Sequence, residues 1–206
     1  ADLETVIPSE PDDAQTFASL ATIASKLDDN ALSVALNKKA LALDPSSANI
    51  YCNLGIALSE MGDLDGAETS LRAALDLQPG HISAIFSLGT GRGLLDGDIL
   101  AQAEKLAASG DLDDEQRTKL KFALAHQYQK RSDYGRAFQM AVAANALRKR
   151  KLENDNKGFS PDYHRDFLER IKTVFSGQFF AGRKSNLDPP AQPIFILGMP
   201  RSGTTL

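Results

Sequence analysis

A repeat of 34 residues is the feature of this sequence that most restricts how the chain can fold. Residues 14–47 align with residues 48–81, and large, small and proline positions coincide. The matched pairs are Phe17 with Tyr51, Leu20 with Leu54, Ala21 with Gly55, Ser33 with Ala67, Ala40 with Ala74, Leu41 with Leu75, Leu43 with Leu77 and Pro45 with Pro79. A unit this short buries its apolar face only by stacking on neighbouring units. The repeat therefore predicts a solenoid.

The spacing inside the repeat predicts two helices joined by a turn. The apolar stripe of the first helix consists of Tyr51, Leu54 and Leu58, and that of the second consists of Ala67, Leu71, Ala74 and Leu75. Gly55 lies beside the first stripe, where a missing side chain lets a neighbouring helix come close. Gly62 and Asp63 form the turn, and Pro79 ends the second helix. The unit is a helical hairpin.

Two further units are less regular. The third begins with Ile85, Leu88, Gly89 and Leu95, turns at residues 96–98 and continues as a second helix over residues 99–108. The fourth spans residues 113–150 and turns at Ser132 and Asp133; its second helix carries Tyr134, Ala137, Phe138, Ala141 and Ala144. We therefore predict an all-α solenoid of about four hairpins over residues 14–150, after a lead-in of residues 1–13. In length and in its pattern of large and small residues, the unit resembles the tetratricopeptide repeat (TPR).

A solenoid of this kind presents a concave groove lined by the first helix of each hairpin, and its expected partner is a protein or peptide. The predicted groove residues are Thr22, Cys52, Ile56, Phe86, Phe122 and His126. For Cys52 we expect an inert thiol that is either buried or faces the groove. Some TPR domains grip a peptide carboxylate with Lys and Arg at these positions, but the first two repeats place none there, so that activity is not transferred. A nearly uncharged groove could equally hold a neighbouring segment of the same protein.

Residues 151–193 form a predicted connector. Ser160 and Pro161 are typical of a helix start, and Gly177 of its end. The helix between them has an apolar stripe of Tyr163, Phe167, Ile171, Val174 and Phe175. Residues 188–193, with three prolines, predict a stiff linker.

The last stretch, residues 194–206, predicts an anion site. Four apolar residues at 194–197 are typical of a short buried strand, and a loop from Gly198 to Gly203 precedes hydroxyl residues suited to a helix start. Free backbone N–H groups and the helix dipole favour a phosphate there. A nucleotide-triphosphate loop would carry Lys after the second glycine, but this chain has Thr204, so kinase and ATPase activities are disfavoured.

The sequence Pro-Arg-Ser-Gly-Thr-Thr at residues 200–205 resembles the 5′-phosphosulfate loop of sulfotransferases. These are α/β enzymes that use 3′-phosphoadenosine 5′-phosphosulfate (PAPS), and the order of segments is similar to that of bacterial TPR–sulfotransferase proteins. The resemblance implies that Ser202, Gly203, Thr204 and Thr205 bind the 5′-phosphate. It also implies that Arg201 neutralises the phosphosulfate and stabilises the leaving oxygen as the sulfuryl group transfers to a hydroxyl or amine.

The resemblance further implies that the chain is truncated after the loop and is not active by itself. The repeats would then bind an acceptor or the protein's own sulfotransferase domain. The competing hypothesis is a TPR scaffold with no enzymatic role.

Charge is divided unevenly. Residues 1–115 hold 6 basic and 20 acidic residues, whereas residues 116–206 hold 17 and 7, within a total charge of −4. The total charge disfavours a nucleic-acid partner, and no apolar run approaches the roughly 20 residues of a membrane helix.

The single cysteine excludes an intrachain disulfide. No metal site is expected, and we expect a cytoplasmic protein. The glycines of residues 89–93 and the basic residues 148–151 are assigned structural roles ahead of phosphate or partner binding.

Overall fold

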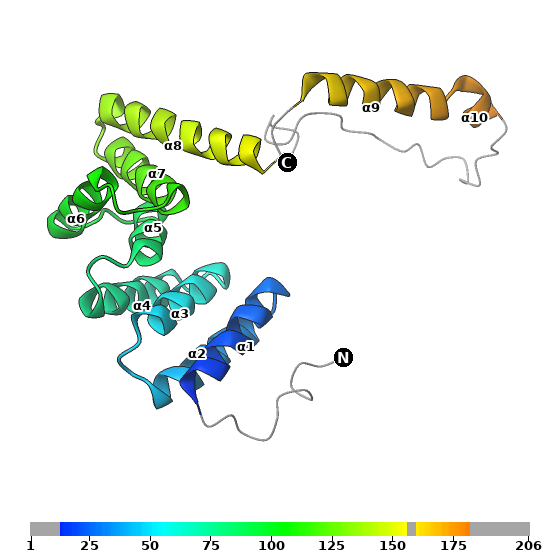
Figure 1. Ribbon diagram of the computed structural model, residues 1–206. Coiled ribbons are helices and arrows are strands. Elements are labelled where there is room, and N and C mark those ends of the chain that lie inside the picture. Colours follow the sequence, from blue (N-terminus) through cyan, green and yellow to red (C-terminus); the bar gives the residue numbers. More distant parts are fainter. Residues whose placement is uncertain (1–12, 156–159, 182–206) are drawn as a thin grey trace, which may run out of the picture. The chain divides into compact units, whose positions relative to one another are not determined.

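The computed structural model describes residues 13–155 and 160–181, and every regular element in these ranges is an α-helix (Figure 1). The helices are α1 (Ala14–Lys26), α2 (Asn30–Leu43), α3 (Ala48–Glu60), α4 (Leu64–Leu77), α5 (Ile82–Thr90), α6 (Gly97–Ala108), α7 (Asp114–Lys130), α8 (Tyr134–Asn154), α9 (Pro161–Val174) and α10 (Gly177–Ala181). The predicted strand, the phosphosulfate loop, residues 1–12 of the lead-in and the proline-rich linker lie outside the described residues. The chain divides into two compact units, residues 1–158 and 159–206, which we describe separately.

In the first unit, α1 with α2, α3 with α4, and α7 with α8 pack as helical hairpins, and successive hairpins contact one another. The same turn closes all three. One residue adopts a left-handed conformation, with φ of 61° at Asp28, 86° at Gly62 and 62° at Ser132. The next residue is in each case an aspartate whose side chain accepts a hydrogen bond from the third backbone N–H after it. The predicted turns at residues 62–63 and 132–133 are therefore confirmed, and their capping bonds start the second helices.

Small residues allow the first helices to approach their neighbours closely. A Cβ atom added to Gly55 would lie 2.7 Å from Cγ of Leu71, and one added to Gly89 would lie 2.8 Å from Cβ of Ala123. Both glycines are buried within helices; Gly55 faces α4 of its own hairpin, and Gly89 faces α7. This confirms that the repeat's small position serves close packing, at residue 89 as well as residue 55.

The third unit differs from the prediction. Helix α5 ends at Thr90, and Leu95, predicted as part of its stripe, lies in the following loop with only 4% of its surface exposed. Helix α6 begins at Gly97, two residues earlier than predicted, and Asp96 makes no side-chain capping bond. The third unit has no left-handed residue followed by a bonded aspartate, so its two helices do not close into a tight hairpin. Instead, α5 and α6 both pack against α7.

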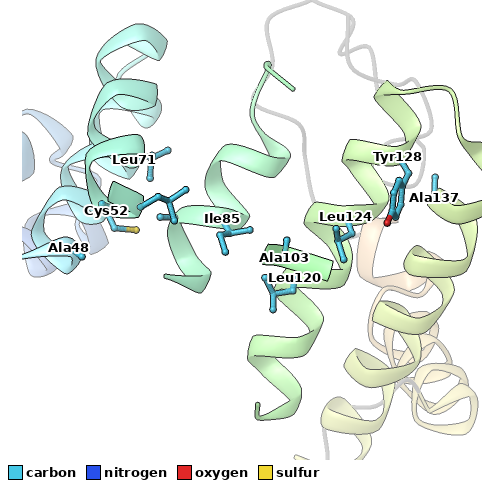
Figure 2. Close-up of a cluster of buried hydrophobic side chains, with 12 residues drawn as sticks. Ala48, Cys52, Leu71, Ile85, Ala103, Leu120, Leu124, Tyr128 and Ala137 are labelled. Carbon is cyan, nitrogen blue, oxygen red and sulfur yellow. The ribbon is translucent and has the colours of Figure 1, made fainter. Parts of the chain in front are cut away.

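Figure 2 shows one core that runs through α3 to α8. Its labelled side chains are Ala48, Cys52, Leu71, Ile85, Ala103, Leu120, Leu124, Tyr128 and Ala137. Two smaller clusters lie under α1 to α4. The predicted stripe of the fourth unit is only half buried: Ala137 and Ala144 are covered, whereas Tyr134 and Phe138 are 67% and 72% exposed. No further hairpin follows α8 in the part of this unit that the structure describes, so this face is left uncovered.

In the second unit, α9 begins as predicted. The hydroxyl of Ser160 accepts a hydrogen bond from the backbone N–H of Tyr163 at 3.2 Å, and Pro161 occupies the first turn. Gly177 does not end this helix, because α9 stops at Val174 and Gly177 starts α10. The predicted apolar stripe of α9 is exposed.

Candidate binding groove

The first helices of the hairpins form one continuous row. Helix α1 contacts α3, α3 contacts α5, and α5 contacts α7, so residues from different repeats share a face. The groove residues predicted from sequence lie along this row. Thr22 is exposed, and Ile56, Phe86, Phe122 and His126 are partly exposed.

Cys52 is the exception: its listing among the groove residues was wrong, and the alternative of a buried thiol is confirmed. Its side chain is 1% exposed and lies in the core cluster with Leu71 and Ile85 (Figure 2). Because neighbouring residues of a helix point in different directions, Cys52 lies on the face of α3 that packs against the next layer and not on the open face. Burial raises the pKa of the Cys52 thiol to about 11, so the sulfur stays protonated and unreactive.

A hollow between α1, α2 and α3 brings two predicted groove residues together. Thr22 and Ile56 both line a cavity of about 230 Å³. The remaining lining residues are Ala21, Ser25, Lys26, Ser33, Asn37 and Asn53. The hydroxyl of Thr22 donates to the carbonyl oxygen of Ala18 at 3.0 Å, and that of Ser25 donates to Glu60 at 3.4 Å. Sequence reasoning identified Thr22 and Ile56 but missed Lys26 and Asn53 on the first helices, and Ser33 and Asn37 on the second helix α2.

A second hollow, of about 530 Å³, lies at the N-terminal ends of α5 and α7. His81 caps α5: its Nδ1 atom accepts a hydrogen bond from the N–H of Ala84 at 3.2 Å, and its Nε2 atom lies 2.9 Å from Oδ1 of Asn49. Because Nδ1 accepts, the ring is neutral with its proton on Nε2. Burial lowers the pKa of His81 and supports this neutral form. Asp113, Glu115 and Lys119 complete the polar rim.

His126 is partly exposed on α7, and burial together with the charge of Lys130 lowers its pKa. Phe122, four residues earlier on the same helix, is also partly exposed. In the described residues, no three His, Cys, Asp or Glu side chains form a group that could hold a metal ion.

A buried amide fixes the loop between α5 and α6, and sequence reasoning missed it. Gln127 is fully buried on the packed face of α7, three residues after Leu124. Its Nε2 atom donates to the carbonyl oxygens of Gly89 at 2.8 Å and Gly93 at 3.1 Å, while its Oε1 atom accepts from the N–H of Leu95 at 2.8 Å. One feature of the sequence could have predicted it: Gln127 is a polar residue on an otherwise apolar stripe of the helix.

Two basic side chains extend this clamp. Arg131 donates to Oε1 of Gln127 at 2.6 Å and to the carbonyl of Leu95 at 2.6 Å. Lys130 donates to the carbonyl of Gly91, and to that of Gly93 at 2.8 Å. The glycine-rich segment therefore uses its backbone oxygens to hold its own fold, which supports the structural interpretation of residues 89–93 over a phosphate loop.

The basic run at residues 148–151 also has internal partners. Arg150 pairs with Asp114 at 2.8 Å, and Lys151 pairs with Glu115 at 2.6 Å. These contacts join the end of α8 to the start of α7, and the bond from Lys151 lowers the pKa of Glu115. The run is thus partly neutralised by the acidic first turn of α7, which the prediction of a solvated helix end did not include.

The predicted cofactor residues Arg201, Ser202, Gly203, Thr204 and Thr205 lie outside the described residues, so no geometry is assigned to them. None of the described helices has the length and apolarity needed to cross a membrane.

Comparison with known proteins supports the repeat architecture. Residues 36–69 match the family described as tetratricopeptide repeat. The crystal structure of MamA aligns with 73% of this chain and 86% of its own, at 18% identity and a TM-score of 0.55. A second MamA structure aligns with 77% of this chain and 85% of its own, at 18% identity and a TM-score of 0.49. The first likeness shows the fold alone.

An uncharacterized protein of Aquifex aeolicus is 36% identical over 103 residues. The match covers 50% of this chain but only 13% of that protein, so the matched half of this chain corresponds to a small part of that protein. The fold is thus a TPR-like helical solenoid.

Proposed function

We propose that the solenoid binds an extended peptide segment of a partner protein along the row of first helices. The observation that carries the proposal is the hollow between α1, α2 and α3, where Thr22 and Ile56, two predicted groove residues from successive repeats, line one cavity. Its lining combines apolar surface with hydroxyl and amide groups, the composition that fits a peptide chain.

A substitution at the rim tests this function. The Thr22 side chain is exposed and its hydroxyl bonds only the carbonyl four residues before it, so Thr22→Arg fills the mouth of the hollow without disturbing the core. Thr69→Arg is the matched control, because Thr69 is also exposed and makes the same type of bond, to Asp65, on the second helix α4. A peptide isolated from a random display library on this chain should lose at least about tenfold in affinity with Thr22→Arg only.

Equal affinities for the wild type and both variants would contradict groove binding. Loss in both variants would mean that bulk charge, rather than the hollow, governs the interaction.

We further propose that the repeats serve a PAPS-dependent cytoplasmic sulfotransferase. The support is the sequence motif at residues 198–205, in which Arg201 supplies the cation and Ser202, Gly203 and Thr204 the backbone N–H donors. The scaffold hypothesis uses the same solenoid without this chemistry. The two differ in whether the protein binds the donor nucleotide.

Calorimetry on the protein expressed from its complete gene distinguishes the sulfotransferase hypothesis from the scaffold hypothesis. Adenosine 3′,5′-bisphosphate, the desulfated donor, should bind, and Arg201→Ala should weaken it by at least about tenfold, or about 1.4 kcal/mol. Arg165→Ala is the control, since Arg165 is exposed on α9 and pairs with Asp162. Absence of binding, or unchanged binding by Arg201→Ala, would favour the scaffold.

A further inference from the structure

A hollow of about 440 Å³ in the first unit is lined by residues of α6, α7 and α8. Three of the lining residues are cations, Arg117 and Lys121 of α7 and Arg150 of α8. Among the residues that the structure describes, none that lines this hollow is acidic. Arg117 and Lys121 are partly exposed and Arg150 is exposed. The three side chains therefore form a cationic rim that an occupant of the hollow can contact.

Two of these charges have no carboxylate partner within the described ranges. Arg117 donates from Nη2 to the carbonyl oxygen of Leu112, and Lys121 makes no hydrogen bond or ion pair with a described residue. Arg150 is paired with Asp114 at 2.8 Å through Nη2 alone. Arg117 and Lys121 lie four residues apart on one helix, where like charges repel each other. An anion bound between them would relieve this repulsion.

The net charge of the rim indicates that the anion is a dianion. Two positive charges remain once the carboxylate of Asp114 is set against Arg150, and the carbonyl end of α6, which also lines the hollow, offsets about half of one charge. A phosphate monoester carries a charge of about −1.5 to −2 at neutral pH, whereas a single carboxylate would leave part of the rim uncompensated. Its three terminal oxygens also accept from several directions, which suits donors on two different helices.

The size and floor of the hollow indicate that the phosphate is carried on an organic group. The volume lies within the range of about 300–1,000 Å³ that is typical of sites for small organic ligands, and a free phosphate ion would leave most of it empty. Most of the other lining residues are apolar, including Ala143, Ala146 and Leu147 of α8. This floor can contact the carbon atoms of a phosphate ester while the cations contact its oxygens.

We propose that this hollow binds a phosphate monoester, of the kind carried by a phosphorylated serine or threonine side chain. Arg117 and Lys121 neutralise the phosphate, Arg150 adds donors from α8, and the apolar floor contacts the ester carbon atoms. The hollow shares no residue with the one between α1, α2 and α3, so the inference is independent of the proposed peptide groove.

Titration with N-acetyl-O-phosphoserine methylamide, followed by NMR of the ¹⁵N-labelled chain, tests the site. The probe should shift the backbone signals of Ser109, Lys121 and Ala146, and the corresponding serine compound should not. The glutamate analogue should bind at least about tenfold more weakly, because it carries only one charge. Inorganic phosphate should also bind more weakly, because it has no carbon atoms to contact the floor. Absence of shifts with phosphoserine, or equal affinity for the glutamate analogue or for inorganic phosphate, would overturn the inference.

Variants of the rim and floor test whether the hollow itself holds the probe. Lys121→Gln removes a rim charge and should weaken binding at least about tenfold. Ala146→Leu should also weaken it, because it fills the floor from an exposed position without changing charge. Lys119→Gln is the matched charge control on α7, and Ala101→Leu is the matched control at an exposed position of α6; neither residue lines the hollow. Arg201→Ala should leave the shifts unchanged, which separates the hollow from the predicted phosphosulfate loop.

The controls decide between a defined site and general attraction to a basic surface. Lys119→Gln should change affinity by less than about threefold, because salt screens charges outside the hollow. An equal loss with Lys119→Gln and Lys121→Gln, or unchanged binding by both Lys121→Gln and Ala146→Leu, would overturn the site. Loss of the shifts with Arg201→Ala would overturn it as well, because the probe would then bind at the loop.

Discussion

Replacement of Gln127 by leucine should destabilise the junction between α5 and α6 by about 3 kcal/mol. Leucine fills most of the same space, so the loss comes from hydrogen bonds rather than from a cavity. The N–H of Leu95 and the carbonyl of Gly89 lose the bonds that Gln127 gives them, whereas Gly93 keeps its bond from Lys130 at 2.8 Å. Each buried backbone group left unpaired costs about 1–3 kcal/mol, and carbonyls tolerate this better than N–H groups.

Hydrogen exchange of the Leu95 amide measures this effect locally. A solenoid can open in parts, so a local probe is more informative than global unfolding alone. About 3 kcal/mol corresponds to about a 150-fold loss of protection. Gln129→Leu, two residues further on α7 at an exposed position, should change stability by less than about 0.5 kcal/mol. If Gln127→Leu leaves the protection of Leu95 within about threefold of the wild type, the buried amide does not hold the loop.

Three further predictions concern packing, pH and thiol reactivity. Gly55→Ala should lower the free energy of unfolding by about 1–3 kcal/mol, measured in urea, because the added Cβ would lie 2.7 Å from the Leu71 side chain. Gly97 has open space around it, so Gly97→Ala should not destabilise the protein. Burial lowers the folded-state pKa of His81, so its contribution to stability is complete above about pH 6.5 and is lost as the pH falls from there towards the folded pKa. Melting temperatures at about pH 7.5 and about pH 5.5 should therefore differ less in His81→Asn, which caps Ala84 at either pH; an equal drop in both proteins would contradict this role. Cys52, with a pKa of about 11, should resist iodoacetamide at about pH 8 until the chain is unfolded in urea, and rapid labelling of the native protein would refute its burial.

Local signals were sufficient to predict the hairpins but not how the third unit packs. The turns at Gly62 and Ser132 are visible because a breaker or polar residue precedes an aspartate cap, and both are chain-local features. The opening of the third unit depends on α7 competing with α6 for the surface of α5, which involves residues more than 30 positions apart. A stripe pattern specifies that Leu95 is buried, but not that it is buried from a loop.

The groove was partly predictable for a similar reason. Helical spacing identified Thr22 and Ile56 on the open face. A residue only one position away along a helix can face the packed side, and Cys52 does so. The sequence did not predict that Asn37 lines the hollow, because Asn37 belongs to a second helix. Residues of α2 line the hollow only because α2 packs between α1 and α3.

The two fully buried amides of this solenoid differ in how completely the fold satisfies them. Gln127 uses both ends of its amide on backbone groups and a guanidinium, so the protein already satisfies it. Asn37 uses only its nitrogen, and its oxygen has no partner among the described residues. Leucine should therefore act in opposite directions at the two positions. At residue 127 it strands backbone groups and lowers stability. At residue 37 it removes an unpaired acceptor, and in an Ala21→Gly background, which reproduces the Gly55–Leu71 pair of the second repeat, it should leave stability unchanged or raise it by about 1 kcal/mol relative to Ala21→Gly alone. A loss of stability at both positions would contradict this difference, because it would mean that the Asn37 amide stabilises the fold despite its unpaired oxygen.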